Sequence, residues 1–110
     1  MFGLILPFSS LSNYNDSSIK RIKINQFLNQ NWKDINLLIL IGSLSASVRL
    51  ISPFLVSKEK DPGVIVINNN CSKIIPLVGL HQSKAQIIAY QIANLIGGDV
   101  IFLIFLGLLF

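Results

Sequence analysis

Short, uninterrupted apolar runs constrain the fold of this chain more than any other feature. Three of them are bounded by glycine or asparagine and consist of Leu37–Ile41, Val64–Ile67 and Ile74–Val78. Apolar stretches this short, closed by turn residues, are typical of strands buried on both faces of a sheet. We therefore expect a central sheet with helices packed on its two sides.

Helical spacing appears between these runs. A polar loop offers Asp16 or Ser17 as an N-cap, and Pro53 and Gly97-Gly98 are expected to end the second and third helices. The apolar positions that recur every three or four residues are Ile19, Ile22, Phe27, Leu28; Leu44, Val48, Ile51, Leu55; and Ala85, Ile88, Ala89, Ile92, Ile96. This pattern predicts three helices, with a loop over 29–36 between the first helix and the next strand.

Residues 68–70 are three asparagines, which tolerate the positive φ of a tight reversal. They predict that the strands on either side of them are antiparallel. A first strand over 2–7 and a last strand beginning at Asp99 complete the order β-α-β-α-β-β-α-β. We predict an α/β domain over residues 1–101, a three-layer sandwich with a mixed, mostly parallel sheet of about five strands and three helices.

The apolar composition raises the alternative of a small membrane protein, since the mean hydropathy is +0.64 and only 13% of residues are charged. A spanning helix needs about 20 apolar residues. The C-terminal run, 100–110, is shorter, and the stretch 37–56 contains Arg49 and Pro53. A charged side chain at mid-span is costly. We therefore expect no membrane association and a cytoplasmic location.

Ionisable and metal-ligating residues exclude several functions. The net charge is +4, but the nine basic residues are scattered, so nucleic-acid binding is not expected. One cysteine and one histidine are too few for a zinc cluster, and we expect no metal site. Glu59 and Asp61 lie in a charged turn and are expected to be solvated rather than an acid–base pair.

Chemistry is expected where strands lead into helix N-termini, because free backbone N–H groups there attract anions. The first such junction contains Gly42, Ser43 and Ser45, with Arg49 in the helix behind it as a bidentate partner for a carboxylate. A tight turn and a surface arginine would explain the same residues without a ligand. The junction is nevertheless a candidate substrate-binding element.

The second junction begins at Gly79 and contains Lys84 and the only histidine, His81. A histidine beside a helix N-terminus is favoured as a neutral base or hydrogen-bond partner, and a capping role is the alternative. We expect the two junctions to lie side by side, so that Arg49 and His81 share one pocket.

Four segments, in a fixed order, resemble the N-terminal domain of the cobalamin biosynthesis protein CbiG. They are Val48–Leu55, which is similar to V-R-x-I-A-P-x-L; Lys58–Val66, similar to D-K-x-x-D-P-A-V-V-V; Leu77–His81, similar to L-x-x-G-H; and Ala89–Gly98, similar to L-A-x-x-I-A-x-x-L-G-A. The resemblance covers 42–101, and the first forty residues agree in pattern only.

This resemblance implies a cobalt-precorrin-5A hydrolase, which opens the lactone of its tetrapyrrole substrate and releases acetaldehyde. It implies His81 as a catalytic residue and Gly42, Ser43, Ser45, Arg49, Gly79 and Lys84 as substrate-binding residues. Cobalt would arrive within the substrate, with no cofactor held by the protein. A further C-terminal domain or a precorrin-3B methyltransferase is the implied partner.

Departures from the family pattern leave alternatives open. Leu80, Ser83 and Lys84 stand where the family has glycines, which favours a catalytically inactive tetrapyrrole-binding or docking remnant. Residues 102–110 form an apolar tail unlike the polar loop of the family, which suggests truncation or a frameshift. The chain alone is expected to be inactive.

Overall fold

The computed structural model describes residues 2–7, 17–79 and 85–101, with side chains described from residue 24 onward. Five strands and three α-helices alternate in the order expected from the sequence. The elements are β1 (Phe2–Pro7), α2 (Ser17–Asn31), the short 3-10 helix η1 (Trp32–Asp34), β2 (Ile35–Ile41), α3 (Leu44–Ile51), the 3-10 helix η2 (Ser52–Phe54), β3 (Gly63–Ile67), β4 (Lys73–Val78), α4 (Ala85–Ile96) and β5 (Asp99–Val100).

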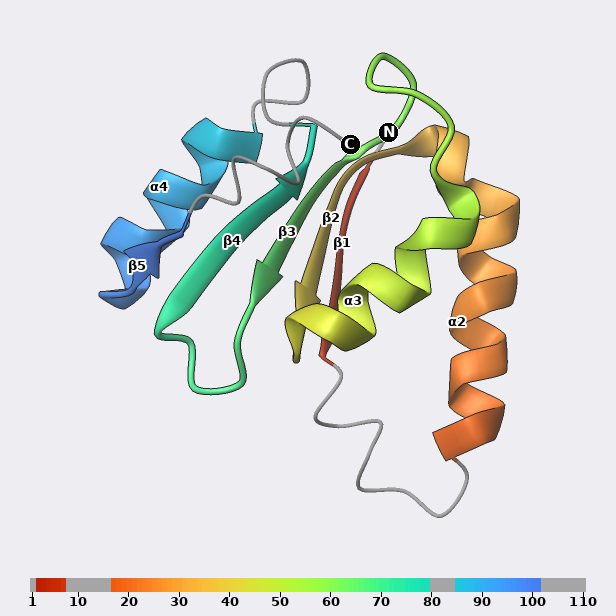
Figure 1. The fold of residues 1–110 in the computed structure, drawn as a ribbon, viewed down its shortest axis with the longest axis horizontal. Coiled ribbons are helices and arrows are strands. Elements are labelled where there is room, and N and C mark those ends of the chain that lie inside the picture. Colours follow the sequence, from red (N-terminus) through yellow and green to blue (C-terminus); the bar gives the residue numbers. More distant parts are fainter. Residues whose placement is uncertain (1, 8–16, 80–84, 102–110) are drawn as a thin grey trace.

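The five strands form one mixed sheet in the sequential order β1-β2-β3-β4-β5. β1, β2 and β3 are parallel neighbours, whereas β4 runs antiparallel to β3 and parallel to β5 (Figure 1). Each of the three apolar runs between residues 37 and 78 is a strand here, and β3 is buried along its whole length. The expectation of a mixed, mostly parallel sheet is confirmed.

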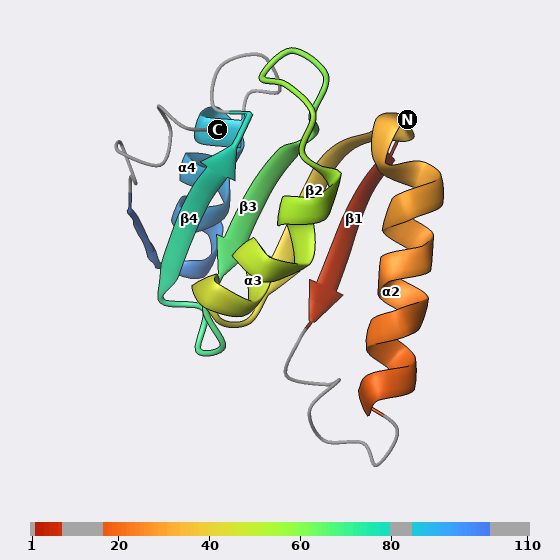
Figure 2. The same ribbon diagram turned by 45° about the vertical axis from the view of Figure 1, so that its right-hand side comes forward.

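Helices cover both faces of this sheet, as Figure 2 shows most clearly, with α2 and α3 on one side and α4 on the other. Two cores lie between the layers. One joins Leu38, Leu40, Val64 and Val66 to residues of α2 and α3, and the other joins Ile65 and Ile74 to α4. β3 contributes side chains to both cores, because neighbouring residues of a strand point to opposite faces of the sheet.

The reversal at β4 explains why α4 lies apart from the other helices. Crossovers between parallel strands are right-handed in nearly all proteins. The connections through α2 and α3 therefore lie on the same face while the chain steps across the sheet. After the hairpin the strands run the opposite way but the stepping continues in the same direction. A right-handed connection then places α4 on the opposite face.

Local details differ from the sequence-based expectation at two places. The first helix continues through Asn31 and η1, and β2 already begins at Ile35, so the expected loop over 29–36 is wrong. Trp32 explains the difference, because its side chain is buried in the core and keeps this segment regular. In the hairpin, positive φ falls on Cys71 (φ 59°) and not on one of the three asparagines.

The ends of the second and third helices are as expected. α3 ends at Ile51, two residues before Pro53, and Ser52 and Pro53 continue into η2. Gly97 follows α4 with φ 74°, and its N–H donates to the carbonyl of Ala93. Within the ranges described, no helix combines the length and apolar character that crossing a bilayer requires. The apolar tail at 102–110 lies outside those ranges.

Candidate functional site

The junction between β2 and α3 is built from a glycine and a capping serine. The backbone N–H of Gly42 donates to the carbonyl oxygen of Ile67 at 2.8 Å, which continues the pairing of β2 with β3. Ser43 is the N-cap, and its Oγ accepts from the N–H of Ala46 at 3.2 Å. The Gly42 amide, one of those expected to bind a ligand, is therefore already used, and the Ser43 side chain is occupied by the cap. The N–H groups of Leu44 and Ser45 have no acceptor among the described residues.

Arg49 lies on the same helix as this junction, further along its axis. Its side chain is exposed and forms no ion pair within the described part of the chain. Ser45 is also exposed, whereas Ser47 is fully buried and its Oγ donates to the Ser43 carbonyl at 2.9 Å. Ser45 and Arg49 are thus both exposed on α3, where a carboxylate of a ligand can reach them.

The second junction leaves β4 at Gly79. This residue has φ 72°, in the left-handed region that favours glycine, and its carbonyl accepts from the N–H of Ala85 at 3.4 Å. The left-handed backbone conformation therefore accounts for a glycine at this position. His81 and Lys84, the other predicted site residues of this junction, lie outside the described residues.

The two junctions lie at opposite ends of the sheet, and the expectation that they adjoin is wrong. Gly42 contacts Ile67 at the end of β3, whereas Val78, just before Gly79, pairs with Val64 near its beginning. At about 3.3 Å per residue, this separates Gly42 from Gly79 by roughly 13 Å along the strands. Figure 1 shows β4 running against β1, β2 and β3, so its carboxyl end meets their amino ends. The antiparallel hairpin between β3 and β4 causes this separation of the two junctions.

Asp61 organises the Gly79 end of the sheet and is buried, contrary to the expectation that it is solvated. The residue is 7% exposed, and its Oδ1 accepts from Trp32 Nε1 at 3.1 Å and from the Val56 N–H at 2.8 Å. Trp32 in turn stacks on Phe54, with ring centroids 5.6 Å apart. Glu59 is exposed, so the two carboxylates are not a pair.

Asp61 also closes a loop, which we call the 55–61 loop. Its N–H donates to the carbonyl of Ser57 at 3.0 Å, and the Lys60 N–H donates to the Ser57 carbonyl and hydroxyl, both at 3.2 Å. Sequence reasoning missed this arrangement because the partner of Asp61, Trp32, is 29 residues away. The available signal was the Asp61-Pro62-Gly63 turn, which directly precedes a fully buried strand.

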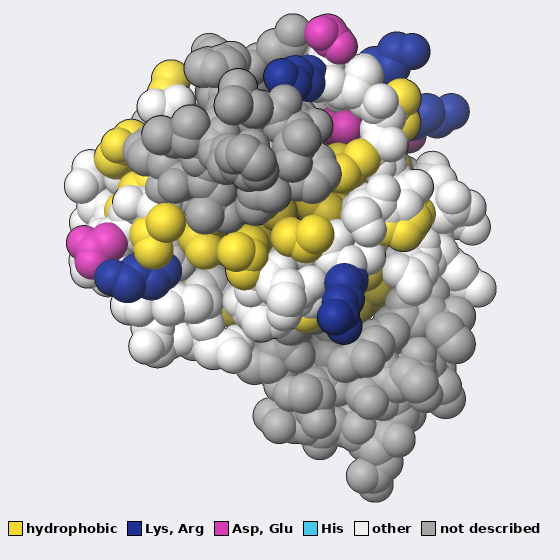
Figure 3. Space-filling view, viewed as in Figure 1, with side chains coloured by type: hydrophobic (Ala, Val, Ile, Leu, Met, Phe, Trp, Pro, Cys, Tyr) yellow, Lys and Arg dark blue, Asp and Glu magenta, His cyan; other side chains and the backbone are white. Residues whose placement is uncertain are grey.

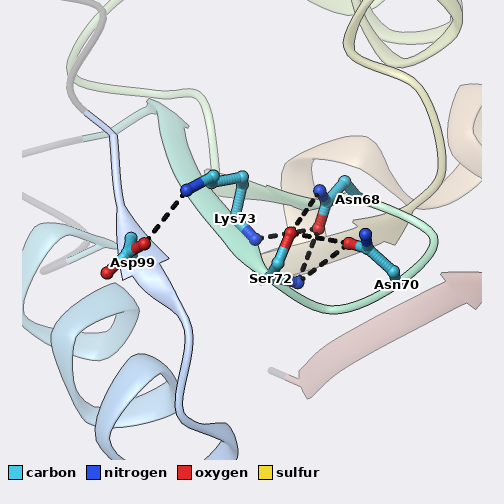
Figure 4. Close-up of polar contacts among 5 residues, drawn as sticks. All are labelled: Asn68, Asn70, Ser72, Lys73 and Asp99. Atoms are coloured by element: carbon cyan, nitrogen blue, oxygen red, sulfur yellow. Dashed lines mark hydrogen bonds and ion pairs between the residues drawn. The ribbon is translucent and has the colours of Figure 1, made fainter.

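Polar side chains of the hairpin organise the opposite end (Figure 4). Asn68 donates from Nδ2 to Ser72 Oγ at 2.9 Å, and its Oδ1 accepts from the N–H groups of Ser72 and Lys73. Asn70 Oδ1 accepts from Ser72 Oγ at 2.6 Å. Lys73 Nζ and Asp99 Oδ2 form an exposed ion pair at 3.0 Å. These contacts fix the hairpin and join it to β5. Within the described ranges there is also no cluster of side chains that could hold a metal ion.

Taken together, a mixed sheet between two helical layers, with ordered loops at both ends, defines an α/β domain of the kind that presents ligand sites at strand termini. The family described as "Cobalamin synthesis G N-terminal" matches this chain over residues 26–102. The chain belongs to this family and is a CbiG-type N-terminal domain of cobalamin biosynthesis.

Two relatives agree with this assignment. The chain is 32% identical over 62 residues to the cobalt-precorrin-5A hydrolase of Salmonella typhimurium, which is 56% of this chain and 18% of that protein. It is 38% identical over 56 residues to the enzyme of the same name from Priestia megaterium, covering 51% and 15%. The matched region is thus less than a fifth of either relative.

The fold also matches the crystal structure of a homologue of cobalamin biosynthesis protein G from Sulfolobus solfataricus. The TM-score is 0.66 at 19% identity, covering 90% of this chain and 35% of that one. At this identity the likeness concerns the fold alone.

Proposed function

We propose that this chain supplies the N-terminal domain function of a cobalt-precorrin-5A hydrolase, binding the carboxylate-bearing tetrapyrrole whose lactone is opened with release of acetaldehyde. The observation that carries the proposal is the family match over residues 26–102, because both curated relatives given above bear that enzyme name. The net charge of +4 supports it, since a basic surface attracts a polyanionic ligand.

We assign the reacting region of the substrate to the Gly79 end of the sheet. Gly79 leads into the segment that contains His81 and Lys84, and the 55–61 loop lies at the same end, because Val64 and Val78 are paired. In this proposal His81 is a base or hydrogen-bond donor toward the lactone and Lys84 binds a carboxylate. The turnover of lactone to acetaldehyde also involves protein beyond this domain.

We assign an outlying carboxylate arm of the substrate to the Gly42 end. The unpaired N–H groups at Leu44 and Ser45 and the exposed guanidinium of Arg49 support this role. Gly42 and Ser43 shape the turn, since the N–H of Gly42 and the Oγ of Ser43 already have protein partners. The distance between the ends means that one small pocket does not contain both sets.

The remaining parts of the proposal concern cobalt, partners and location. Cobalt travels within the substrate, and this domain holds no cofactor of its own. The natural partners are the rest of a longer hydrolase or a precorrin-3B methyltransferase, and nucleic acid is not among them. We place the domain in the cytoplasm, together with the tetrapyrrole pathway it serves.

A chimera tests the catalytic part of this proposal. Residues 26–102 of this chain replace the matched region of the Salmonella relative, and acetaldehyde release from cobalt-precorrin-5A is measured. We expect release by the chimera and its loss in the His81→Ala version, with Asn69→Ala, an exposed hairpin change, as the matched control. Equal release with and without His81 would remove this residue from the mechanism.

A binding domain without catalytic contribution is the second candidate function. The observation favouring it is that Leu80, Ser83 and Lys84 replace family glycines, so backbone approach to the substrate is restricted. In that case the chain shifts the visible spectrum of a corrinoid on titration, while the chimera releases no acetaldehyde. Release by the chimera would eliminate this candidate.

A further inference from the structure

We infer that the 55–61 loop is a further carboxylate-binding element, in which Lys58 and Lys60 contact the substrate and Asp61 is the positioning residue that fixes the loop. The inference rests on the proposed function, because a carboxylate-bearing tetrapyrrole is the ligand. It adds two binding residues and one positioning residue to the set proposed above.

The loop is fixed at both of its ends by one buried carboxylate. Asp61 Oδ1 and Oδ2 accept from the Val56 N–H at 2.8 and 3.1 Å, and the Asp61 N–H donates to the Ser57 carbonyl at 3.0 Å. Trp32 Nε1 attaches the same carboxylate to the core. The backbone between Val56 and Asp61 is therefore a small closed ring anchored to the domain.

Charged side chains project from this ring. Lys58, Glu59 and Lys60 are all exposed, and within the described ranges none of them forms an ion pair. Figure 3 shows basic and acidic side chains gathered around this loop, at the top of the molecule. Lysine ammonium groups without partners remain available to an anionic ligand, and a fixed backbone lowers the entropy lost when they bind it.

An exposed apolar side chain lies on the same loop. Val56 is 68% exposed, between the core contact of Leu55 and the charged tip. A flat macrocycle with carboxylate arms presents an apolar face and an anionic edge. Val56 can contact the apolar face of such a ligand, and Lys58 and Lys60 can bind its anionic edge. The loop lies beside Gly79, because β3 begins where β4 ends, so it adjoins the end to which the lactone was assigned.

The test is a titration with uroporphyrin I, a tetrapyrrole bearing acetate and propionate arms, followed by porphyrin absorbance at low ionic strength. The Lys58→Gln/Lys60→Gln double variant is expected to bind about five-fold more weakly. Glu59→Gln removes the negative charge between the lysines and is expected to bind about two-fold more tightly. Both differences shrink at high salt, because exposed charges are screened.

Asp61→Asn separates positioning from charge. Loss of a negative charge by itself would tighten the binding of an anion, whereas release of the loop weakens it. We expect binding about three-fold weaker than that of the parent chain, and no further loss when the change is made in the double lysine variant. A merely structural role of Asp61 would lower affinity equally in both backgrounds.

The outcomes are distinguishable. No binding of uroporphyrin I by the parent chain would overturn both the inference and the tetrapyrrole function. Binding that is equal in the parent and the double lysine variant would overturn the inference alone, and loss confined to Arg49→Gln would assign the arm contacts to the other end. The lysine changes are at the surface, so they decide the question even if Asp61→Asn does not fold.

Discussion

At one end of the sheet a single buried carboxylate, Asp61, joins two distant segments, whereas at the other end several uncharged groups of the hairpin share the same task. Asp61 holds Trp32 and Val56 with the protein's only described buried charge. Asn68 and Ser72 hold the hairpin through amide and hydroxyl contacts that are partly open to water. One end of the sheet therefore depends on a single charged group, whereas the other depends on several hydrogen bonds that can replace one another.

The difference has a physical cause. A buried carboxylate is costly unless its hydrogen bonds are all made, so loss of a partner is severe. A solvent-accessible amide network can exchange a lost contact for water. We therefore expect the two ends to respond unequally to comparable truncations.

The largest effect is expected at the carboxylate. Asp61→Ala leaves the Trp32 Nε1–H and the Val56 N–H without their acceptor and should lower the free energy of unfolding by about 3 kcal/mol. Urea denaturation followed by circular dichroism measures it. Glu59→Ala, two residues away and exposed, is the matched control and should change stability by less than about 0.5 kcal/mol. Equal losses in the two variants would contradict the buried role of Asp61.

The next effect concerns two adjacent glycines at the hairpin end. A Cβ on Gly98 would lie 2.5 Å from Ile74 Cδ1 and 3.0 Å from the Ser72 carbonyl oxygen, so Gly98→Ala should lose about 2 kcal/mol through overpacking. Gly97 has open space around its Cα but φ 74°, so Gly97→Ala should lose about 1 kcal/mol through backbone strain.

Gly97→Asn distinguishes these two causes. Asparagine tolerates the left-handed region, so it should recover part of the loss at position 97. At position 98 any side chain should be worse than alanine. If a larger side chain at position 98 gave a higher melting temperature than alanine, steric contact with β4 would not limit that position.

The hairpin amide is expected to matter less. Asn68→Ala removes one side chain's contacts to Ser72 Oγ and to the N–H groups of Ser72 and Lys73, and should cost about 1 kcal/mol because water reaches the site. Asn69→Ala, exposed at the neighbouring position, should be neutral. If Asn68→Ala matched the loss at Asp61, the contrast between the two ends would fail.

The smallest effect is expected at the ion pair. Lys73 and Asp99 side chains are 43% and 77% exposed, so Lys73→Gln should change stability by about 0.5 kcal/mol or less. The change should vanish in high salt, where exposed charges are screened. A loss that persists in high salt would point to packing of the lysine stem instead.

Much of the fold follows from local sequence patterns. The apolar runs Leu37–Ile41, Val64–Ile67 and Ile74–Val78 became strands, and the Ala85–Ile96 stripe became α4. These elements are predictable because burial and periodicity are properties of neighbouring residues. The reversal at the three asparagines was also predictable, and it separates Gly42 from Gly79.

Features that depend on distant contacts were not predictable. The buried Asp61 carboxylate accepts a hydrogen bond from Trp32, which lies 29 residues earlier in the sequence. The composition around Asp61, with Lys58, Glu59 and Lys60, is that of a solvated turn, so charge pattern indicated the wrong environment. The expectation that the Gly42 and Gly79 junctions lie side by side failed for a related reason, because strand direction decides which strand ends meet.

Chemical-shift mapping tests the central claim most directly. The ¹⁵N-labelled chain is titrated with uroporphyrin I, and backbone amide shifts are followed in two-dimensional spectra. The account predicts the largest shifts at Lys58, Lys60 and Gly79, with smaller ones at Ser45 and none at Asn69. Shifts confined to the hairpin end, or absent throughout, would contradict the assignment of the tetrapyrrole to the Asp61 end of the sheet.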